Sequence, residues 1–286
     1  MDLDTIREVV VPRDRAELAA ARSSAPGTAI LAGGTFLYSE PQERLDRLVD
    51  LTGLGWPALT LHECGLEIAA TCTLAEFAGA TPGRELGLSP RWFGLPATAL
   101  FAASCRALLA SHKIWRSATV GGNICLALPA GAVLAALVAL DADAVIWPAS
   151  GGERRIALRD FVLGPGRTVL EPGDVLRALK VNSLILMSRT AIRKVALAPL
   201  GRSGAVVMGR RDIDGTVALT VSAATSKPVV LGFYGAPTRE EIDEAVAGID
   251  PELWFDDPHG DPAWRAHVTG LLAHEVCSEL AGGARS

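Results

Sequence analysis

Two pairs of adjacent glycines are the residues whose type and spacing best suggest a chemical role in this 286-residue chain. Gly121-Gly122 lies in the segment ATVGGNICLALP, and Gly33-Gly34 lies far upstream in LAGGT. Glycine lets the backbone adopt positive φ angles and approach a ligand closely, and successive backbone N–H groups can converge on an anion. One such pair alone most often marks a tight turn. Two pairs, each beside a β-prone segment, favour a diphosphate held by backbone N–H groups, with side-chain hydrogen bonds from Thr35, Thr119 and Asn123.

Motifs of covalent or metal catalysis are absent from the sequence. It contains no G-x-S-x-G elbow, no P-loop and no H-E-x-x-H motif, and its carboxylates are scattered. We therefore expect a chain that binds a cofactor rather than one that attacks a substrate itself. The five cysteines form no C-x-x-C pair, so we expect no disulfide framework, no metal site and no iron–sulfur site of the chain's own. These cysteines are Cys64, Cys72, Cys105, Cys125 and Cys277.

Composition narrows the class of protein and its partners. Apolar residues make up 49% of the chain and the mean hydropathy is +0.29, yet no apolar run reaches the roughly 18 residues of a membrane helix. The net charge of −5 and the lack of a basic block argue against nucleic acid as a partner. The acidic start of the chain does not resemble a signal peptide, which predicts a cytoplasmic protein. The surplus of apolar residues suggests burial against partner subunits, although a large core can also absorb it.

The first fifty residues are predicted to form a small βαβ-type unit. Segments 5–11, 28–31 and 48–51 are short and β-prone. Asp14, with Glu17 three residues later, is typical of a helix start. The first glycine pair follows 28–31 directly, so it lies at the end of a strand, where α/β sheets bind ligands.

The middle of the chain is predicted to be mixed α/β and the last third a meander of strands followed by helices, with a boundary near 182–190. The expected later strands are 59–61, 66–71, 144–147, 154–158, 175–181, 190–198, 205–209 and 217–224. The expected helices are 74–77, 95–110, 130–140, one capped by Thr238 with Glu241, and 262–280, whose buried face would carry Trp264, Val268, Leu271, Leu272 and Val276. Loops are expected at 81–90, 121–123 and 163–168.

Taken together, these motifs resemble a known family. LAGGT (31–35) and ATVGGN (118–123), followed by PAG, LDA, DF, GPGRT and GDVL in order, are similar to the FAD-binding subunit of the molybdenum hydroxylases, the xanthine dehydrogenase and carbon monoxide dehydrogenase family. The resemblance covers nearly the whole chain. It implies an α+β protein with a two-part FAD-binding domain at 1–182, divided into a small subdomain at 1–53 and a larger one at 54–182. It also implies a C-terminal domain at 183–286, with an antiparallel sheet and helices, like that of the carbon monoxide dehydrogenase flavoprotein.

The resemblance also implies which residues bind FAD. Two loops would wrap the diphosphate, Leu109 in the preceding helix and Leu176 would pack near the cofactor, and a cation from the segment 192–194 would face the isoalloxazine. The implied residues are Ile30, Leu31, Ala32, Gly33, Gly34, Thr35, Phe36, Leu37, Leu109, Ala118, Thr119, Val120, Gly121, Gly122, Asn123, Leu176, Arg193 and Lys194.

Several positions depart from the family pattern. Leu128 stands where the family has Ser, Ala132 where it has Asp, and Trp115-Arg116 replaces an Arg-Asn pair; Ile192 stands at the aromatic position before the expected cation. These changes remove polar contacts to the ribityl or adenosine part of the cofactor. They imply either weaker FAD binding or replacement of the lost contacts by other groups.

The function implied by the resemblance is electron transfer. A molybdopterin-binding large subunit would oxidise a substrate, and a [2Fe-2S] small subunit would pass the electrons to the FAD of this chain and on to an acceptor. Two alternatives remain open: an FAD oxidoreductase that acts alone, and a flavin-free subunit that keeps the fold for assembly.

Overall fold

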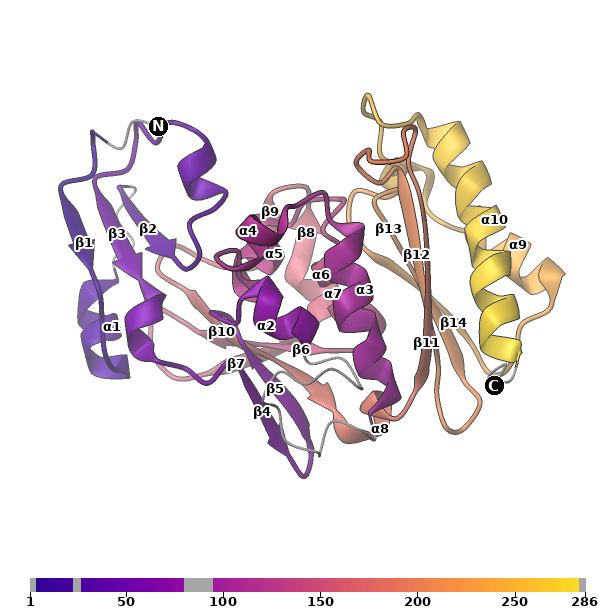
Figure 1. Cartoon of the computed structure of the whole chain (residues 1–286), viewed down its shortest axis with the longest axis horizontal. Helices are drawn as coiled ribbons and strands as arrows, with labels where there is room; N and C mark the ends of the chain where they lie inside the picture. Colours follow the sequence, from indigo (N-terminus) through magenta and orange to yellow (C-terminus); the bar gives the residue numbers. More distant parts are fainter. Residues whose placement is uncertain (1–3, 23–26, 80–94, 283–286) are drawn as a thin grey trace.

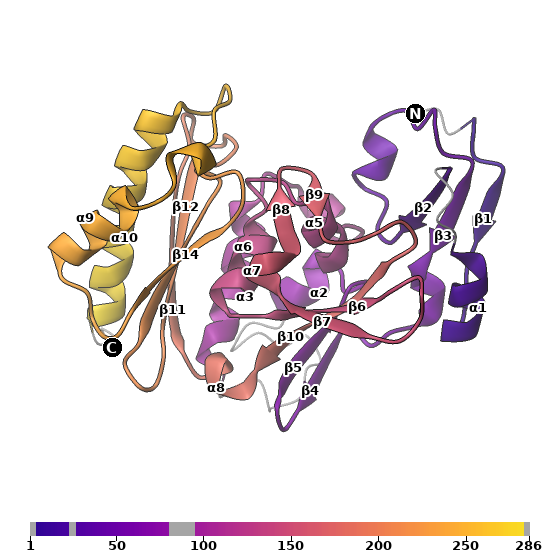
Figure 2. The ribbon, with the colours of Figure 1, turned by 180° about the vertical axis from the view of Figure 1, so that it is seen from behind.

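The three larger β-sheets of the described residues follow one another along the chain and lie side by side in space (Figures 1 and 2). The computed structural model describes residues 4–22, 27–79 and 95–282, so the loop expected at 81–90 lies outside the described residues. The strand orders are β1-β3-β2, β4-β5-β10-β6-β7 and β11-β12-β13-β14. A parallel N-terminal sheet, an antiparallel middle sheet covered by helices and an antiparallel C-terminal sheet with helices confirm the expected α+β class.

The N-terminal sheet is parallel and small. It consists of β1 (Glu8–Val10), β3 (Arg47–Asp50) and β2 (Thr28–Leu31), with β3 in the centre. Helix α1 (Arg15–Ala21) begins at Asp14, whose carboxylate accepts hydrogen bonds from the N–H groups of the first turn. The predicted strand–helix–strand unit is therefore confirmed, and the first glycine pair follows β2 as expected.

The middle sheet carries most of the helices on one face (Figure 1). Its strands are β4 (Leu59–His62), β5 (Gly65–Ala69), β6 (Asp143–Trp147), β7 (Arg154–Ala157) and the central β10 (Val175–Asn182). Its α-helices are α2 (Leu74–Gly79), α3 (Ala99–Ala107), α4 (His112–Trp115), α5 (Val120–Leu126), α6 (Ala132–Ala139), α7 (Leu158–Phe161) and α8 (Ser183–Leu186). Short 3₁₀ turns lie at Leu37–Ser39, Leu51–Leu54, Pro96–Thr98 and Pro251–Leu253.

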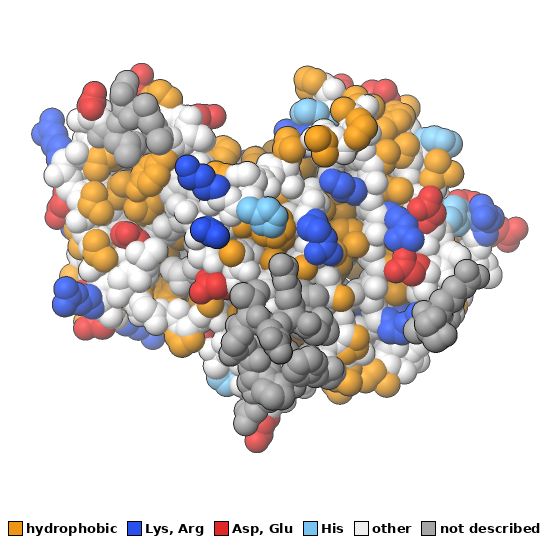
Figure 3. Space-filling view, viewed as in Figure 1, with side chains coloured by type: hydrophobic (Ala, Val, Ile, Leu, Met, Phe, Trp, Pro, Cys, Tyr) orange, Lys and Arg blue, Asp and Glu red, His pale blue; other side chains and the backbone are white. Residues whose placement is uncertain are grey.

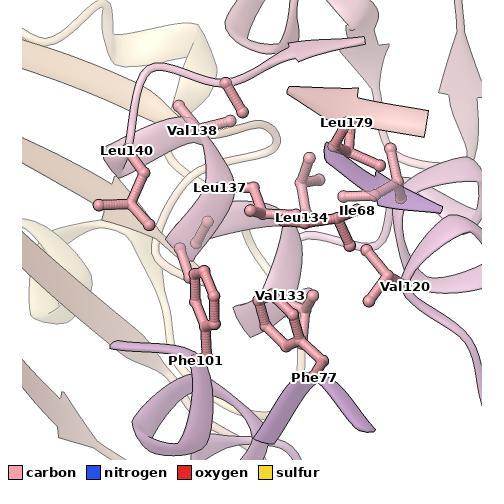
Figure 4. Packing of buried hydrophobic residues seen from close by; sticks show 14 of the residues in the cluster. Ile68, Phe77, Phe101, Val120, Val133, Leu134, Leu137, Val138, Leu140 and Leu179 are labelled. Carbon is pink, nitrogen blue, oxygen red and sulfur yellow. The ribbon is translucent and has the colours of Figure 1, made fainter. Parts of the chain in front are cut away.

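Helix α6 lies at the centre of the main core. Every residue from Ala132 to Ala139 is buried, as expected for a helix that is apolar on all sides. Figure 4 shows Leu134 and Leu137 close to Ile68 and Leu179 of the sheet, with Phe101 on the helical side of the cluster. The expected helix at 130–140 is thus confirmed, and it connects the middle sheet to the layers around it.

The C-terminal sheet is an antiparallel meander. Its strands are β11 (Arg189–Val195), β12 (Ala205–Arg211), β13 (Val217–Ser222) and β14 (Val229–Phe233). Helix α10 (Pro262–Ala281) covers one face, together with α9 (Arg239–Ala247), whose predicted Thr238–Glu241 capping box is present. Strands β12 and β13 are buried almost throughout because α6 packs against the opposite face.

Several details of the sequence prediction were wrong. Strand β14 was not predicted, because its Pro-preceded, Gly-containing stretch alternates only weakly. Leu271 is 53% exposed, although the pattern placed it on the buried face of α10. The segment expected as a loop at 163–168 forms a short hairpin of β8 (Val162–Gly164) and β9 (Arg167–Thr168).

A buried arginine ties the C-terminal elements together. Arg265, on α10, is only 1% exposed. Its guanidinium donates to the Asp257 carboxylate and to the backbone oxygens of Gly204, Ala223 and Gly260. A buried charge is tolerated when it is paired and hydrogen-bonded in this way, so Arg265 joins α10 to the loops around β12 and β13.

Candidate cofactor-binding site

A cavity of about 860 Å³ lies between the N-terminal sheet and the helices of the middle layer. Both glycine pairs line it, although they are far apart in the sequence. Leu51 and Val175 line it as well, from the end of the N-terminal sheet and from the start of β10. Its volume is within the usual range for a site that holds an organic ligand or cofactor.

The first glycine pair leaves backbone donors free at the cavity wall. Gly34 has a φ of +66°, which favours glycine, and the turn it makes is closed by a hydrogen bond from Tyr38 N–H to Gly34 O. Within the described part of the chain, the N–H groups of Gly33, Gly34 and Thr35 donate to no protein acceptor. Unpaired backbone N–H groups need a partner, so this loop can bind an anionic or oxygen-rich ligand.

The second glycine pair lies in a helix, which corrects the expected loop at 121–123. Helix α5 begins after Thr119, whose hydroxyl accepts a hydrogen bond from Gly122 N–H at 3.1 Å. Burial of Val120 and Ile124 favours the helix despite its two glycines. The sequence pattern missed it because glycine lowers helix propensity.

The backbone donors at the start of α5 are already used within the protein. Val120 N–H donates to Cys72 O and Gly121 N–H to Ala70 O, each at 2.8 Å. A Cβ on Gly121 would lie 2.6 Å from atoms of Ala70, so this glycine serves close packing. A Cβ on Gly122 would meet only Thr119 Oγ1, at 3.1 Å. The second pair therefore provides a flat wall rather than an anion-binding turn.

Two polar side chains of the second motif line the cavity. Asn123 Oδ1 accepts a hydrogen bond from Leu134 N–H at 3.1 Å, which connects α5 to α6. The Asn123 amide N–H groups have no partner among the described residues, and the Thr119 hydroxyl accepts without donating. Both side chains can donate hydrogen bonds to a ligand.

The structure brings most of the predicted site residues together. The cavity is lined by Ile30, Leu31, Ala32, Gly33, Gly34, Thr35, Phe36, Leu37, Leu109, Ala118, Thr119, Gly121, Gly122, Asn123 and Leu176. Leu109 follows α3 instead of lying within a helix, and it is 72% exposed. The family departures at Leu128 and Ala132 do not line the cavity.

Three predicted residues are not part of the cavity wall. Val120 is buried beneath it. Arg193 and Lys194 lie on β11 of the C-terminal sheet, and Arg193 pairs with Glu275 and Glu279 of α10 at 3.1 and 2.7 Å. The structure therefore does not bring the expected cation of 192–194 to the cavity.

Sequence reasoning missed the acidic part of the wall. Glu40, Glu171 and Asp174 line the cavity, whereas no lysine, arginine or histidine does so within the described ranges. Asp174 accepts hydrogen bonds from the N–H groups of Ala149 and Glu171 and lies 3.5 Å from Arg154. The Glu171 carboxylate has no partner in the described part of the chain. Asp174 is part of the GDVL motif quoted above, but neither it nor Glu40 and Glu171 was among the residues expected to bind the cofactor.

One thiol also lines the cavity. Cys125 is exposed there, yet its sulfur is crowded by protein, and this burial raises its pKa to about 12. Among the residues that the structure describes, no group of three or more His, Cys, Asp or Glu is placed to hold a metal ion. None of the described helices is both long and apolar enough to cross a membrane.

Solved structures share this fold over almost its full length. Reconstituted CO dehydrogenase from Oligotropha carboxidovorans superposes with a TM-score of 0.79 at 20% identity, covering 95% of this chain and 96% of that chain. Carbon monoxide dehydrogenase from Hydrogenophaga pseudoflava gives 0.77 at 18% identity, covering 96% of each. Quinoline 2-oxidoreductase from Pseudomonas putida 86 gives 0.78 at 17% identity, covering 100% of each. No curated protein matches the chain in sequence.

The chain also matches a family of cofactor-binding domains over the residues that form the cavity. Residues 5–182 match the family described as the FAD binding domain in molybdopterin dehydrogenase. The matched residues carry both glycine motifs and all the residues that line the cavity. FAD is therefore the cofactor of this type of domain, and the chain belongs to the family of FAD-binding domains of molybdopterin dehydrogenases.

Proposed function

We propose that this chain is the FAD-binding electron-transfer subunit of a multi-subunit molybdenum hydroxylase. It would receive electrons from a [2Fe-2S] small subunit, which is reduced by a molybdopterin-binding large subunit, and pass them to an external acceptor. The observation that carries the proposal is the cavity in which a loop with free N–H donors faces the wall formed by α5.

The cavity residues fit FAD. The N–H groups of Gly33, Gly34 and Thr35 have no acceptor among the residues that the structure describes and can hold the diphosphate, and the side chains of Thr119 and Asn123 can add hydrogen bonds. The absence of a side chain at Gly122 leaves the wall open for the cofactor. When bound, FAD supplies the electron-transfer chemistry, while the protein binds and orients it.

The positions of the three sheets along the chain support a division into domains. We assign residues 1–182 to the FAD-binding domain, with subdomains at 1–53 and 54–182, and residues 183–286 to a C-terminal domain. The strands of the three sheets lie within these three ranges. Leu109 and Leu176 would pack beside the flavin, because both line the cavity.

The surface around the cavity supports a partner subunit. Phe36, Leu109 and Ile114 line the cavity and are also 45%, 72% and 40% exposed, so apolar surface remains at its edge. Figure 3 shows hydrophobic side chains gathered on the face of the N-terminal sheet as well. Exposed apolar patches are typical of protein interfaces, and electron transfer requires the flavin to lie near the cluster of the partner. The cytoplasmic location predicted from the sequence remains a prediction.

The test compares the chain alone with the chain co-expressed with its neighbouring genes. Each purified sample is denatured and centrifuged, and the supernatant is examined for the absorbance spectrum of FAD. We expect released FAD in both samples and substrate-dependent dye reduction only in the complex. A folded but colourless complex would favour the flavin-free assembly subunit, and rapid substrate oxidation by the isolated chain would favour an enzyme that acts alone.

A further inference from the structure

Three consecutive residues at the start of β10 contact three different parts of the molecule. Val175 completes the core of the N-terminal unit. Leu176 is buried in the main core and lines the cavity. Arg177 extends toward two tryptophans, Trp56 and Trp147. The start of β10 is therefore the junction between the N-terminal unit and the middle sheet.

Arg177 is the extra residue of a β-bulge. Leu176 pairs with Ile146 of β6, and Ala178 pairs with the adjacent Val145, so Arg177 has no partner of its own on that strand. On the other side, Arg177 O accepts a hydrogen bond from Ala70 N–H at 3.0 Å. A bulge bends a strand and changes the direction of its side chains, and here it separates Leu176 at the cavity from Arg177 at the tryptophans.

The Arg177 guanidinium is held by aromatic rings and by a carboxylate. It lies 4.3 Å from the ring centroid of Trp56 and 5.7 Å from that of Trp147, and the two rings meet edge to face at 5.5 Å. Glu67 on β5 accepts a hydrogen bond from it at 3.2 Å. A planar guanidinium can stack on rings and pair with a carboxylate at once, which lysine cannot do in the same way.

The same tryptophan receives contacts from helix α1 of the N-terminal unit. The Arg15 guanidinium lies 4.5 Å from the ring centroid of Trp147, and Arg22 Nη1 donates to Trp147 O at 2.9 Å. Arg15 also donates to Gly152 O in the turn between β6 and β7. The chain of contacts thus runs from α1 through Trp147 to Arg177, next to the cavity-lining Leu176.

We propose that Arg177 is a positioning residue that sets the placement of the first glycine loop against α5 by fixing the N-terminal unit to the bulged start of β10. The proposal rests on the proposed function where it concerns FAD, because the cavity lies between these two parts. Arg177 does not line the cavity, so it acts on the cofactor only through the position of the glycine loop.

The test uses the full chain without FAD and three variants. Arg177→Met keeps an unbranched apolar stem but loses the charge and the stack, and Arg177→Lys keeps the stem and the charge but loses the planar group that stacks on the rings. Arg210→Lys is the matched control: Arg210 is buried, pairs with Asp212 at 2.8 Å and donates to Ala139 O, whereas Arg177 is half-buried, and Arg210 lies in the C-terminal sheet. Hydrogen exchange of peptides covering residues 28–37 and the Kd for FAD, from quenching of flavin fluorescence, are measured for each.

We expect Arg177→Met to speed exchange at residues 28–37 and to raise the Kd for FAD by about tenfold, with a smaller effect in Arg177→Lys. Arg210→Lys should change neither quantity even where it lowers the unfolding temperature. Unchanged exchange at 28–37 in Arg177→Met, or equally faster exchange in Arg210→Lys, would overturn the proposal. If Arg177→Met does not fold, Arg177→Lys decides by the same comparison. If the wild type binds no FAD, the proposed function fails, and the exchange data still decide the positioning role.

Discussion

Gly33 packs directly against the backbone of Ser117: a Cβ atom built on Gly33 would overlap the Ser117 carbonyl oxygen. This contact joins the first glycine loop to the segment just before α5, so the two motifs are in direct contact. The glycine is required here by a close approach of two backbones, and its φ is not in the left-handed region.

Replacing Gly33 by alanine should therefore separate the two walls of the cavity. We expect Gly33→Ala to lower the free energy of unfolding by about 1–3 kcal/mol, as overpacking does, and to weaken FAD binding. Urea unfolding and FAD titration measure the two effects. Gly164→Ala is the matched control, because a Cβ there has no neighbour within 4 Å. Equal stability and FAD affinity in both variants would contradict this account of the contact.

Substitutions at Gly122 test the wall of the cavity that α5 forms. We expect Gly122→Asp to fold but to retain no FAD, because the side chain adds bulk and negative charge at the cavity surface. Gly122→Ala should retain part of the FAD, since its Cβ meets only Thr119 Oγ1. The FAD content of the purified protein is the measurement. Wild-type FAD content in Gly122→Asp would show that the diphosphate binds elsewhere.

The charge of the cavity wall predicts an unusual salt dependence. The described wall contains Glu40, Glu171 and Asp174 and no basic side chain. Salt therefore has no attraction between the FAD diphosphate and a basic side chain to screen. The Kd for FAD should stay constant or fall as NaCl is raised, and Glu171→Gln should lower it at low salt. Glu63→Gln, in an exposed turn, is the control. A Kd that rises steeply with salt would reveal a cation in contact with the cofactor.

Cys125 should resist alkylation although it is exposed to the cavity. Its pKa is raised from 9.0 to about 12 by burial, and only the thiolate reacts. Near neutral pH, iodoacetamide should modify exposed Cys64 before Cys125, as peptide mass mapping can show. Because the folded-state pKa is the higher one, the neutral thiol contributes stability below pH 9, which is lost as the pH rises from 9 toward 12. Rapid labelling of Cys125 in the folded chain near neutral pH would be the contrary result.

Loss of Arg265 should destabilise the C-terminal part strongly. We expect Arg265→Met to cost about 3–5 kcal/mol in the free energy of unfolding, because it leaves the mostly buried Asp257 carboxylate without its close partner. Urea unfolding gives the value. Arg202→Met is the matched control, since Arg202 lies 3.9 Å from Asp257 and is more exposed, so its loss should cost less than about 1 kcal/mol. Similar losses in the two variants would show that burial of Arg265 is not the cause.

The sequence predicts the parts of the fold that depend on local pattern. Strand β2, the capping box at Thr238 and the buried helix α6 were predicted because short-range signals determine them. Helix α5 was missed because its two glycines are stabilised by contacts with residues 70–72, which are distant in sequence. Such tertiary contacts can override intrinsic propensity.

The candidate site likewise contains residues that the sequence predicts and residues that it does not. The glycine motifs were recognisable because their residue types are unusual, whereas Glu171 and Asp174 join the cavity only through the return of β10 to the middle of its sheet. Placement of Arg193 failed for a related reason, since its partners Glu275 and Glu279 come from the last helix. No pattern within a short stretch of sequence contains that information.

The core beneath the N-terminal sheet has a consequence for the order of synthesis. Leu18, Ala21, Val49 and Leu51 belong to the beginning of the chain, but Val175, which completes their packing, is made much later. The three parallel strands are therefore synthesised long before Val175, the residue that completes their core. Domains generally fold as units during translation, but the packing of this N-terminal core is completed only after β10 has been synthesised.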